Sequence, residues 1–516
     1  MLLARRLDCL PDPESAFVRL YGASRNAFWL DGAGGGASGR FSFMGDASGP
    51  LGAVVTYDID AGEVRVETAA GVERRRESIF DLLGAALSPP ARGESATAGV
   101  ARALPKGPDV DLPFEFDCGF AGYLGYELKA ECGGTTAHRS PAPDAAFVLT
   151  DRLIAFDHRE GHTYLLALTA ELHQILSPAE QEFDAVRLGR RGEVWIEETE
   201  RRLAELQPLA EPERAAPAAE FGLRRSRERY RRDIQACKRY LIAGDSYEIC
   251  LTNELAARTG ADPLDLYRRL RRANPAPFSA YLRFGELAVL SSSPERFLSI
   301  DAGGGVETRP IKGTSRRGDT PGEDARLAAA LREGAKFRAE NVTIVDLMRN
   351  DLGRVCELGS VSVPELMRVE SYETVHQLVS SVRGRLRPEL GAVDAVRACF
   401  PPGSMTGAPK LRTMEIIDEL EGEARGVYSG AIGWFGRGGA CDLSVAIRTL
   451  VLAGGRASIG AGGAVVVDSD PEEEIAEMLL KAAAAAAALD PGAAISFAPA
   501  AAPDDSRRRP PTPTPS

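Results

Sequence analysis

The sequence predicts an α+β fold built on large antiparallel sheets, and two observations lead to this class. Residues 1 to about 205 alternate short apolar runs with glycine-rich turns, a pattern typical of strands joined by tight connections. Further along, helical and strand patterns are mixed without the regular strand–helix alternation that parallel sheets require. The hydrophobic fraction of 44% in 516 residues allows a large buried core.

The first region, residues 1–205, is predicted to consist mainly of strands. One hairpin is expected around Asp60-Ala61-Gly62, where a glycine closes the turn between two apolar runs. The predicted strands of this region cover residues 54–57, 63–66, 146–149 and 162–168. A helical pattern follows from Glu193 to Leu206.

Changes in composition mark two further boundaries. Residues 206–222 are rich in alanine, proline and glutamate, so we expect a linker there. This linker separates an N-terminal domain, residues 1–205, from a second domain, residues 223–489. Residues 490–516 combine alanine, proline and serine with three consecutive arginines, and we expect a disordered tail.

The second region contains the clearest helix signals. Arg227–Ala243 has the spacing of an amphipathic helix. The terminal helix is expected to begin at Pro471, with Asp470 as its N-cap, and to end near Leu489. Residues 323–352 predict one long helix or two abutting ones. Strands are predicted at residues 247–256, 287–292, 441–452 and 456–467, the last two as a pair.

Charge and cysteine content restrict the kinds of partner and compartment. The net charge is −12, from 62 basic and 74 acidic residues, which argues against nucleic acid or an anionic membrane as the main partner. The eight cysteines form no CxxC pair and no disulfide-like framework, as expected of buried thiols in a reducing cytoplasm. No segment has the length and apolarity of a signal peptide or membrane span. We therefore expect a cytoplasmic protein.

Nine sequence blocks occur in a fixed order in the second region. They read GDSYEICLTNEL, SSSPERF, RPIKGTSRRG, RAENVTIVDLMRNDLGRV, VHQLVS, FPPGSMTGAPKLR, GVYSGAIGW, DLSVAIRTL and GAGGAVVVDSDPEEEIAEMLLKA. Over roughly residues 225–485 they resemble the chorismate-binding domain of the anthranilate, aminodeoxychorismate and isochorismate synthases. The block FDCGFAGYLGYELK at 116–129 resembles the family's N-terminal domain more loosely. The resemblance implies a two-layer antiparallel β-sandwich flanked by helices, with the active site between the layers.

Lys312, at the centre of Pro310-Ile311-Lys312-Gly313-Thr314, bears on the subfamily. A lysine there resembles the aminodeoxychorismate synthase component I type, whereas alanine is typical of anthranilate synthases. The resemblance implies that the Lys312 amine attacks the substrate. Only a free amine attacks carbon, so the pKa of Lys312 must fall through burial or cationic neighbours. Arg309, Arg316 and Arg317 are close in sequence, but their side-chain directions are not given by it.

Two further residues are candidates for proton transfer. Glu295 in SSSPERF resembles the family's carboxylate that handles protons at the leaving hydroxyl. A general acid must start protonated, and an apolar pocket favours this. The alternative is a structural pairing of Glu295 with Arg296 at a strand end. His376 in VHQLVS matches a family histidine near the substrate ring, although a lone histidine is more often structural.

Three glutamates are candidates for binding Mg²⁺. Glu340 shares a helix face with apolar residues at offsets of four, seven and eight, so it is expected to point inward. Glu474 and Glu477 lie on one face of the terminal helix with Lys481, beyond the first turn that the helix dipole explains. The resemblance implies that Glu340 and Glu477, supported by Glu474, hold the metal. The alternative is ordinary surface or helix-pairing glutamates.

Arg448 and Tyr428 are candidates for binding substrate. Arg448 lies in a strand pattern among apolar residues, where a charge must be paired, and a bidentate carboxylate is the natural partner. The resemblance implies that Arg448 binds the ring carboxylate of chorismate and that the Tyr428 hydroxyl adds to it. The alternatives are a structural ion pair for Arg448 and a packed core tyrosine for Tyr428.

Two glycine-containing turns complete the predicted substrate site. Gly313-Thr314 and Gly462-Gly463 allow backbone N–H groups to approach an oxyanion. On their own such turns are weak signals, and the resemblance places them around the substrate carboxylates. Ala464 stands where many relatives keep a third glycine, which makes that contact less secure.

The resemblance implies amination of chorismate at C4 to 4-amino-4-deoxychorismate, on the route to 4-aminobenzoate and folate. Glu248 occupies the place where isochorismate and salicylate synthases carry a water-activating lysine, so water addition is disfavoured. No cysteine lies in a GxCxG elbow typical of glutaminases. We therefore expect ammonia from a separate glutamine amidotransferase subunit, in a heterodimer.

Other functions remain open at this point. Anthranilate synthase component I, an aminating lyase that releases pyruvate, is the alternative enzyme. A paralogue that only binds a ligand or partner would have lost some of the candidate acids and bases, but all of them are present. Residues 28–32 and 274–278 match the family's tryptophan site in part, so we expect a structural tryptophan site without regulation.

Overall fold

Two large sheets organise the computed structural model, which describes residues 2–32, 39–87, 110–168, 185–212, 221–372, 375–490 and 495–499. The first sheet has 13 strands and the second has 12. Among the described residues every strand pairing is antiparallel except that of the two strands at one edge of the first sheet, β11 (Phe221–Leu223) and β25 (Ile495–Pro499). The predicted α+β class with large antiparallel sheets is confirmed.

Each sheet contains strands from both ends of the chain. The first sheet runs in the order β1 (Leu2–Leu7), β10 (His162–Leu168), β9 (Arg152–Asp157), β3 (Phe41–Asp46), β2 (Asn26–Asp31), β13 (Phe278–Phe284), β14 (Leu287–Ser293), β23 (Thr449–Ala453), β24 (Arg456–Val465), β12 (Glu248–Arg258), β11 and β25, with β20 (Gly407–Ala408) beside β12. The second runs in the order β17 (Ile311–Arg316), β19 (Val375–Arg385), β16 (Gly305–Arg309), β15 (Arg296–Ile300), β22 (Cys441–Val445), β21 (Ala431–Gly436), β7 (Gly119–Leu124), β8 (Ala145–Thr150), β4 (Ala53–Asp58), β5 (Glu63–Thr68) and β6 (Gly71–Arg75), with β18 (Ser362–Ser371) beside β19. The predicted boundary near residue 205 therefore separates two stretches of sequence that share both sheets.

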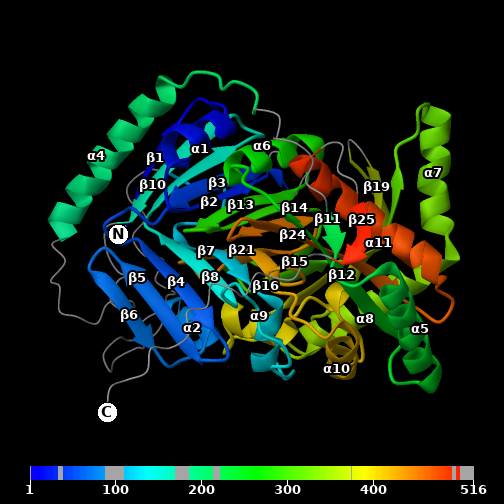
Figure 1. Cartoon of the computed structure of the whole chain (residues 1–516). Coiled ribbons are helices and arrows are strands. Elements are labelled where there is room, and N and C mark those ends of the chain that lie inside the picture. Colours follow the sequence, from blue (N-terminus) through cyan, green and yellow to red (C-terminus); the bar gives the residue numbers. More distant parts are fainter. Residues whose placement is uncertain are drawn as a thin grey trace, which may run out of the picture.

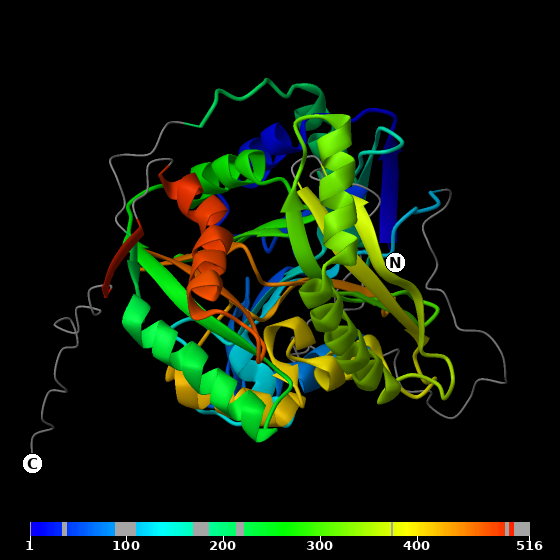
Figure 2. The same ribbon diagram turned by 90° about the vertical axis from the view of Figure 1, so that its right-hand side faces the viewer.

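Helices cover the outer faces of the two layers (Figure 1). They are α1 (Pro13–Tyr21), α2 (Ile79–Leu87), α4 (Ala185–Ala204), α5 (Arg227–Ala243), α6 (Pro263–Ala273), α7 (Pro321–Glu333), α8 (Ala335–Gly353), α9 (Ala392–Cys399), α10 (Lys410–Glu421) and α11 (Pro471–Leu489), with 3-10 turns η2 (Tyr126–Glu131) and η3 (Gly403–Met405). In Figure 2, α8 follows α7 along the side that faces the viewer, and α11 lies across from them.

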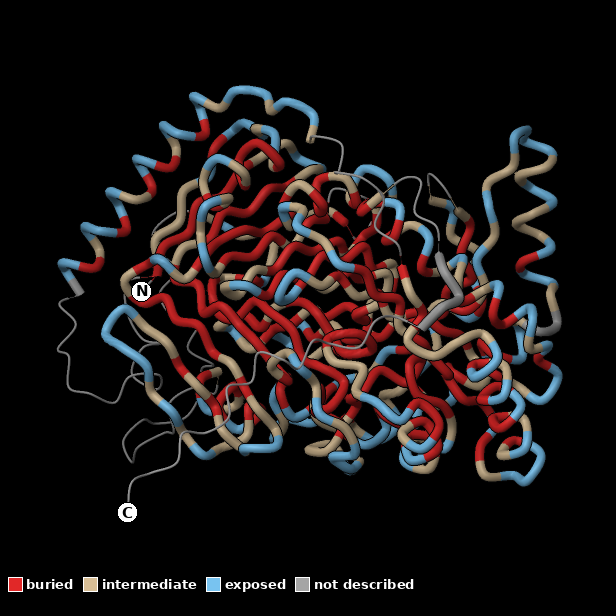
Figure 3. The backbone as a smooth tube through the Cα atoms, viewed as in Figure 1, coloured by how far each residue is buried: buried red, intermediate tan, exposed pale blue. Residues whose placement is uncertain are grey.

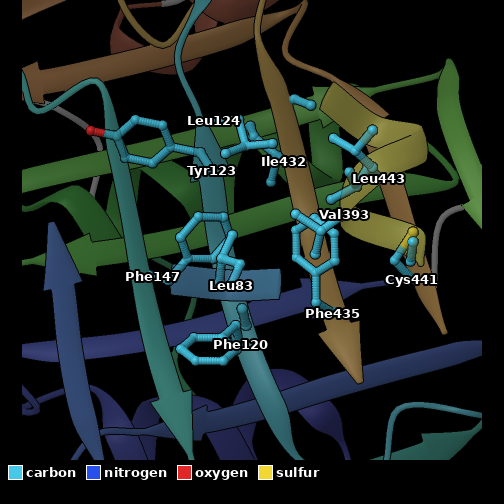
Figure 4. Close-up of a cluster of buried hydrophobic side chains, with 14 of the residues drawn as sticks. Leu83, Phe120, Tyr123, Leu124, Phe147, Val393, Ile432, Phe435, Cys441 and Leu443 are labelled. Carbon is cyan, nitrogen blue, oxygen red and sulfur yellow. The ribbon is translucent and has the colours of Figure 1, made fainter. Parts of the chain in front are cut away.

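Apolar side chains divide into two main cores. One lies between the two sheets and reaches α2 and α9, and the other lies between the first sheet and helices such as α5, α6 and α11. Figure 4 shows part of the first core, where Phe120, Phe147 and Phe435 gather between strands. The buried backbone follows the sheets, whereas α4 and α7 at the two flanks are largely exposed or intermediate (Figure 3).

Local capping explains why several predicted helices have the expected ends. α5 begins after Ser226, whose hydroxyl accepts the Arg229 N–H, and it ends at Gly244, which has a φ of 82°. α11 begins after Asp470, whose carboxylate accepts the N–H groups of Glu472 and Glu473. The segment predicted as one or two helices is two, α7 and α8.

Three predictions about local structure were wrong. Residues 441–452 are not one strand, because Arg448 adopts a φ of 53° and sends β22 into the second sheet and β23 into the first. The helix predicted from Glu193 begins at Ala185. Within the tail expected to be disordered, Ile495–Pro499 forms β25, which pairs with β11 at the edge of the first sheet; the alternating apolar residues Ile495 and Phe497 suit a strand. The rest of the tail and part of the linker lie outside the described residues.

The eight cysteines are all free, and six of them are buried. In the described part of the chain, no helix combines the length and apolarity needed to cross a membrane.

Candidate active site

Lys312 lies in β17 of the second sheet and forms an ion pair with the first sheet. Its Nζ is 2.5 Å from Oε1 of Glu248, the first residue of β12. Both side chains are buried, with residue exposures of 8% and 2%. The pair therefore joins the two layers at the place where the resemblance puts the active site.

The electrostatic surroundings of Lys312 differ from the expectation. Burial disfavours the charged ammonium, but attraction to Glu248 and Glu340 outweighs that effect and raises the pKa of Lys312 above its ordinary value. The two carboxylates therefore favour the ammonium form of Lys312. The free amine that attack on carbon requires must therefore be generated during the reaction.

The three neighbouring arginines do not counter this effect, because each is paired with its own carboxylate. Arg309 pairs with Glu370, Arg316 with Glu323 and Arg317 with Asp324. The expected cationic environment for Lys312 is therefore absent from these positions.

Glu295 has the properties of a general acid. It lies between β14 and β15 and is 5% exposed. Burial raises its pKa to about 7, against the opposing effects of the Ser404 hydroxyl and the ammonium groups of Lys312 and Lys481. The alternative pairing with Arg296 is wrong, since Arg296 binds Asp442 and Glu307 instead.

The first half of α11 brings charged groups onto the glycine strand β24. Lys481 Nζ is 2.7 Å from Glu477 Oε1 and donates to the Gly462 carbonyl at 2.9 Å. A Cβ at Gly463 would lie 2.9 Å from Glu474 Oε2, so a larger side chain would push the helix carboxylates away. Gly463 thus leaves the space that lets α11 approach this strand.

The chemistry of the acidic groups fits Mg²⁺, which prefers carboxylate oxygens and keeps several waters. Glu340 on α8 is 9% exposed and interacts with Lys312. Glu474 is buried and accepts a hydrogen bond from the Ser469 hydroxyl. Within the described ranges there is no group of three or more histidine, cysteine, aspartate or glutamate side chains that could hold a metal. Any metal here would rely on few protein ligands.

Arg448 lies at the break between the two sheets, between β22 and β23. Its Nη1 donates to the backbone carbonyl of Lys481 at 2.9 Å. No carboxylate in the described part of the chain forms an ion pair with Arg448, and burial lowers its pKa. The alternative of a structural ion pair is therefore not supported, and the side chain retains donors for a carboxylate.

Tyr428 packs directly on the backbone of the glycine strand. A Cβ at Gly460 would lie 2.1 Å from Cγ of the Tyr428 ring. Burial raises the pKa of the Tyr428 hydroxyl, which stays protonated and able to donate. Tyr428 also lines a small cavity of about 90 Å³ together with Gly460 and Thr252.

Three predicted site residues have other surroundings. His376 Nε2 is 2.9 Å from Asp324 Oδ1, and its Nδ1 is 2.8 Å from the Ser371 hydroxyl, so both ring nitrogens hold α7 and β18 together. Gly313, with a φ of 92°, packs so closely that a Cβ would lie 2.9 Å from Leu331. Thr314 is exposed.

A larger cavity of about 440 Å³ lies apart from Lys312, and none of its lining residues belongs to the predicted active site. Both segments of the predicted tryptophan site, residues 28–32 and 274–278, contribute to its wall. Its lining includes Phe41, Phe43, Phe114 and Trp434.

The structure adds Glu248, Lys481 and Ser404 to the site. A signal for Lys481 was present in the sequence, since it follows Glu477 by four residues on one helix face. The contact between Glu248 and Lys312 joins residues of different sheets, and spacing along the chain could not reveal it.

Comparison with known proteins identifies the family. The model of the chorismate binding enzymes matches residues 68–487. The chain is 47% identical to an aminodeoxychorismate synthase of Streptomyces pristinaespiralis over 90% of its own length and 62% of that relative. It is 40% identical to aminodeoxychorismate synthase component 1 of Salmonella typhimurium, over 69% of this chain and 73% of the relative. The crystal structure of anthranilate synthase component I from Streptococcus pneumoniae superposes with a TM-score of 0.69 at 29% identity, covering 86% of this chain and 92% of that one. The chain therefore belongs to the chorismate binding enzyme family.

Proposed function

We propose that this chain aminates chorismate at C4 to give 4-amino-4-deoxychorismate, on the route to 4-aminobenzoate and folate. The observation that carries the proposal is a buried lysine, Lys312, placed between the two sheets and electrostatically coupled to the buried acid Glu295. Relatives named aminodeoxychorismate synthase support it, although the chain spans only 62% of the length of the Streptomyces relative.

In the first step, the free amine of Lys312 forms a bond to C2 of chorismate. The ring double bonds shift and the C4–O bond breaks, and Glu295 gives its proton to the departing hydroxyl, which leaves as water. A carboxylic acid with a pKa of about 7 is well matched to this task at neutral pH. Ammonia then forms a bond to C4, the C2–N bond breaks, and Lys312 leaves as an amine.

Two kinds of group offset the two carboxylates of chorismate. We assign the ring carboxylate to the guanidinium of Arg448, with the Tyr428 hydroxyl and the backbone of Gly462 and Gly463 beside it. Mg²⁺ bound by Glu340 and Glu477, with support from Glu474, would neutralise the other carboxylate. His376 and Gly313 receive no chemical step because their contacts are structural, and Thr314 receives none because it is exposed.

The ammonia source in this proposal is a separate glutamine amidotransferase subunit, in a cytoplasmic heterodimer. The name of the Salmonella relative, aminodeoxychorismate synthase component 1, supports the existence of a second component. For the cavity of about 440 Å³ we propose tryptophan as a structural ligand, since residues 30–32 and 277–278 of the two predicted segments line its wall.

Anthranilate synthase component I is the alternative, and the fold shared with the Streptococcus enzyme favours it. Lys312 separates the two, because the alternative predicts alanine there. The test is to incubate purified protein with chorismate, Mg²⁺ and ammonium salts, with and without a glutaminase and glutamine. We expect 4-amino-4-deoxychorismate by liquid chromatography and mass spectrometry. Release of pyruvate and fluorescent anthranilate without an added lyase would contradict the proposal.

A further inference from the structure

Arg448 has a backbone conformation that its side chain disfavours. Its φ of 53° lies in the left-handed region, where the Cβ of any residue but glycine is crowded. Such a conformation persists only where the surrounding structure holds it. It occurs at the point where the chain leaves β22 in the second sheet for β23 in the first. The residues that hold this conformation therefore decide where the guanidinium lies.

The hydroxyl of Thr449 closes over this residue. Its Oγ1 lies 2.9 Å from the carbonyl oxygen of Ile447, so the bond spans Arg448 from one neighbour to the other. The same Oγ1 lies 2.9 Å from the hydroxyl oxygen of Ser291, which faces Thr449 across the β14–β23 pairing. A hydroxyl has one proton and two lone pairs, so it can bond both partners at once. Thr449 and Ser291 are both fully buried, so water does not compete for either bond.

The backbone of Arg448 is held at a further point, and its guanidinium lies among site residues. Its carbonyl accepts the N–H of Ser292 at 3.2 Å, which joins the same pair of strands. Burial lowers the pKa of Arg448, and the opposing effects come from Tyr428 and Glu477, so both lie near the guanidinium. The hydroxyl of Thr449 therefore holds a residue that lies where candidate site groups converge.

We propose that Thr449 is a positioning residue for chorismate binding, because its hydroxyl fixes Arg448 in the conformation that directs the guanidinium to the ring carboxylate. The inference rests on the proposed function, in which Arg448 binds that carboxylate, and deepens it. Thr449 acts through Arg448, since it has no exposed surface of its own. Without the hydroxyl the backbone relaxes toward an extended conformation, and the guanidinium moves with it. A bidentate contact between guanidinium and carboxylate depends on orientation, so this movement weakens it.

The decisive variant is Thr449→Val, which keeps the branched shape of the side chain and removes its hydroxyl. At saturating ammonium the KM for chorismate should rise at least about tenfold, as expected for loss of a hydrogen-bonded contact to a charged group. The kcat should change by less than about threefold, because the carboxylate contact serves substrate and transition state alike. Thr449→Ser keeps the hydroxyl, and its KM should stay within about threefold of wild type.

A double substitution separates positioning from general support of the fold. Arg448→Met should by itself raise the KM for chorismate at least about tenfold. In that background Thr449→Val should add less than about twofold, because the residue that it positions is gone. The control is Thr163→Val, since Thr163 is also fully buried in the first sheet and its hydroxyl donates to the carbonyl of Cys9. The KM of this control should stay within about twofold of wild type.

A KM for Thr449→Val less than about tenfold above that of the control would overturn the inference, as would a kcat lowered more than about threefold. A further rise of about twofold or more in the Arg448→Met background, or of more than about threefold in Thr449→Ser, would also overturn it. If Thr449→Val does not fold, as judged by circular dichroism, Ser291→Ala takes its place under the same criteria, because it removes the hydroxyl that anchors Thr449. Failure of the proposed function would look different. Wild-type protein would then give no aminated product, or Arg448→Met would bind chorismate as tightly as wild type.

Discussion

Two buried ion pairs contact strand β12, and they differ in how many of their polar atoms have hydrogen-bond partners. Glu248 and Lys312 share one hydrogen bond, and Glu248 Oε2 has no partner among the described residues. Glu421 and Arg425 instead share two hydrogen bonds and recruit several more. Both pairs contact β12, so they face comparable costs of burial.

The Glu421–Arg425 pair uses nearly all its hydrogen-bonding capacity. Glu421 Oε1 also accepts from the backbone N–H and hydroxyl of Thr252. Arg425 donates further to the carbonyls of Met405 and Cys250, and its guanidinium lies 4.5 Å from the centre of the Tyr126 ring.

The number of hydrogen bonds made by each buried ion pair distinguishes a structural pair from a pair that is available for function. Arg425 hydrogen-bonds Met405, Cys250 and Ser429, which are close in sequence to Ser404, Glu248 and Tyr428. These bonds hold the segments around the site in position. The Glu248–Lys312 pair keeps unused capacity, which a reacting ligand can take up. The first arrangement stabilises the fold, and the second is available for function.

The largest expected effect is on catalysis, from Lys312→Met. Loss of the nucleophile should lower the rate of 4-amino-4-deoxychorismate formation by at least about 10⁴-fold. Because this variant also leaves Glu248 buried without its cation, it should lower the free energy of unfolding by about 3–5 kcal/mol, so the rate is compared per folded molecule. Chromatographic product assay and calorimetry measure the two quantities. Turnover within tenfold of wild type would remove Lys312 from the mechanism.

Glu295→Gln should slow the reaction by about 10³-fold, since the amide has no proton to give. In wild-type protein the acid form is required, so kcat/KM for chorismate should fall as pH rises through about 7. Measuring kcat/KM for chorismate between pH 5.5 and 9 tests for this decrease. A flat wild-type profile across that range would contradict the assignment of Glu295 as the acid.

Arg425→Met tests the Glu421–Arg425 pair, which uses nearly all its hydrogen-bonding capacity. It leaves Glu421 buried without its cation, which should lower the free energy of unfolding by about 4 kcal/mol. Activity per folded molecule should stay within about tenfold, provided that assays are run well below the melting temperature. Urea denaturation measures the stability change. Arg383→Met is the control and should cost less than about 1 kcal/mol, because Arg383 is exposed and its partner Glu307 keeps the ion pair with Arg296.

The smallest effect is on the pH dependence of stability and concerns Glu127. Its carboxylate accepts hydrogen bonds from the backbone N–H groups of Arg425 and Gly426. Burial raises its pKa to about 7 from 4.5. A raised pKa contributes stability that is full below pH 4.5 and is lost as pH rises through 7, by up to roughly 3 kcal/mol. Glu127→Gln should be less stable at pH 5 but lose less between pH 5 and 8. Parallel curves for the two proteins would contradict this.

Sequence reasoning succeeded where local chemistry decides the structure. Ser226, Asp470 and the periodicity that follows each of them gave α5 and α11 their bounds. It failed at Arg448, because a left-handed arginine between two β-rich runs carries no sequence signal, and the change of sheet there is a tertiary event. The resemblance placed Lys312 and Glu295 in the site. It could not give the charge state of Lys312, which depends on a carboxylate 64 positions away in the other sheet.

The sharing of both sheets by the two ends of the chain has a consequence for how this protein can be divided. In the first sheet β13 pairs with β2, and in the second β21 pairs with β7. A fragment lacking residues 1–205 would expose two long rows of unpaired backbone groups at once, one in each layer. Such edges recruit further strands, so the fragment is expected to aggregate, or to be rescued by the missing segment added in trans. The candidate site residues all come from residues 223–489, but both sheets need the strands of residues 1–205 to cover their edges.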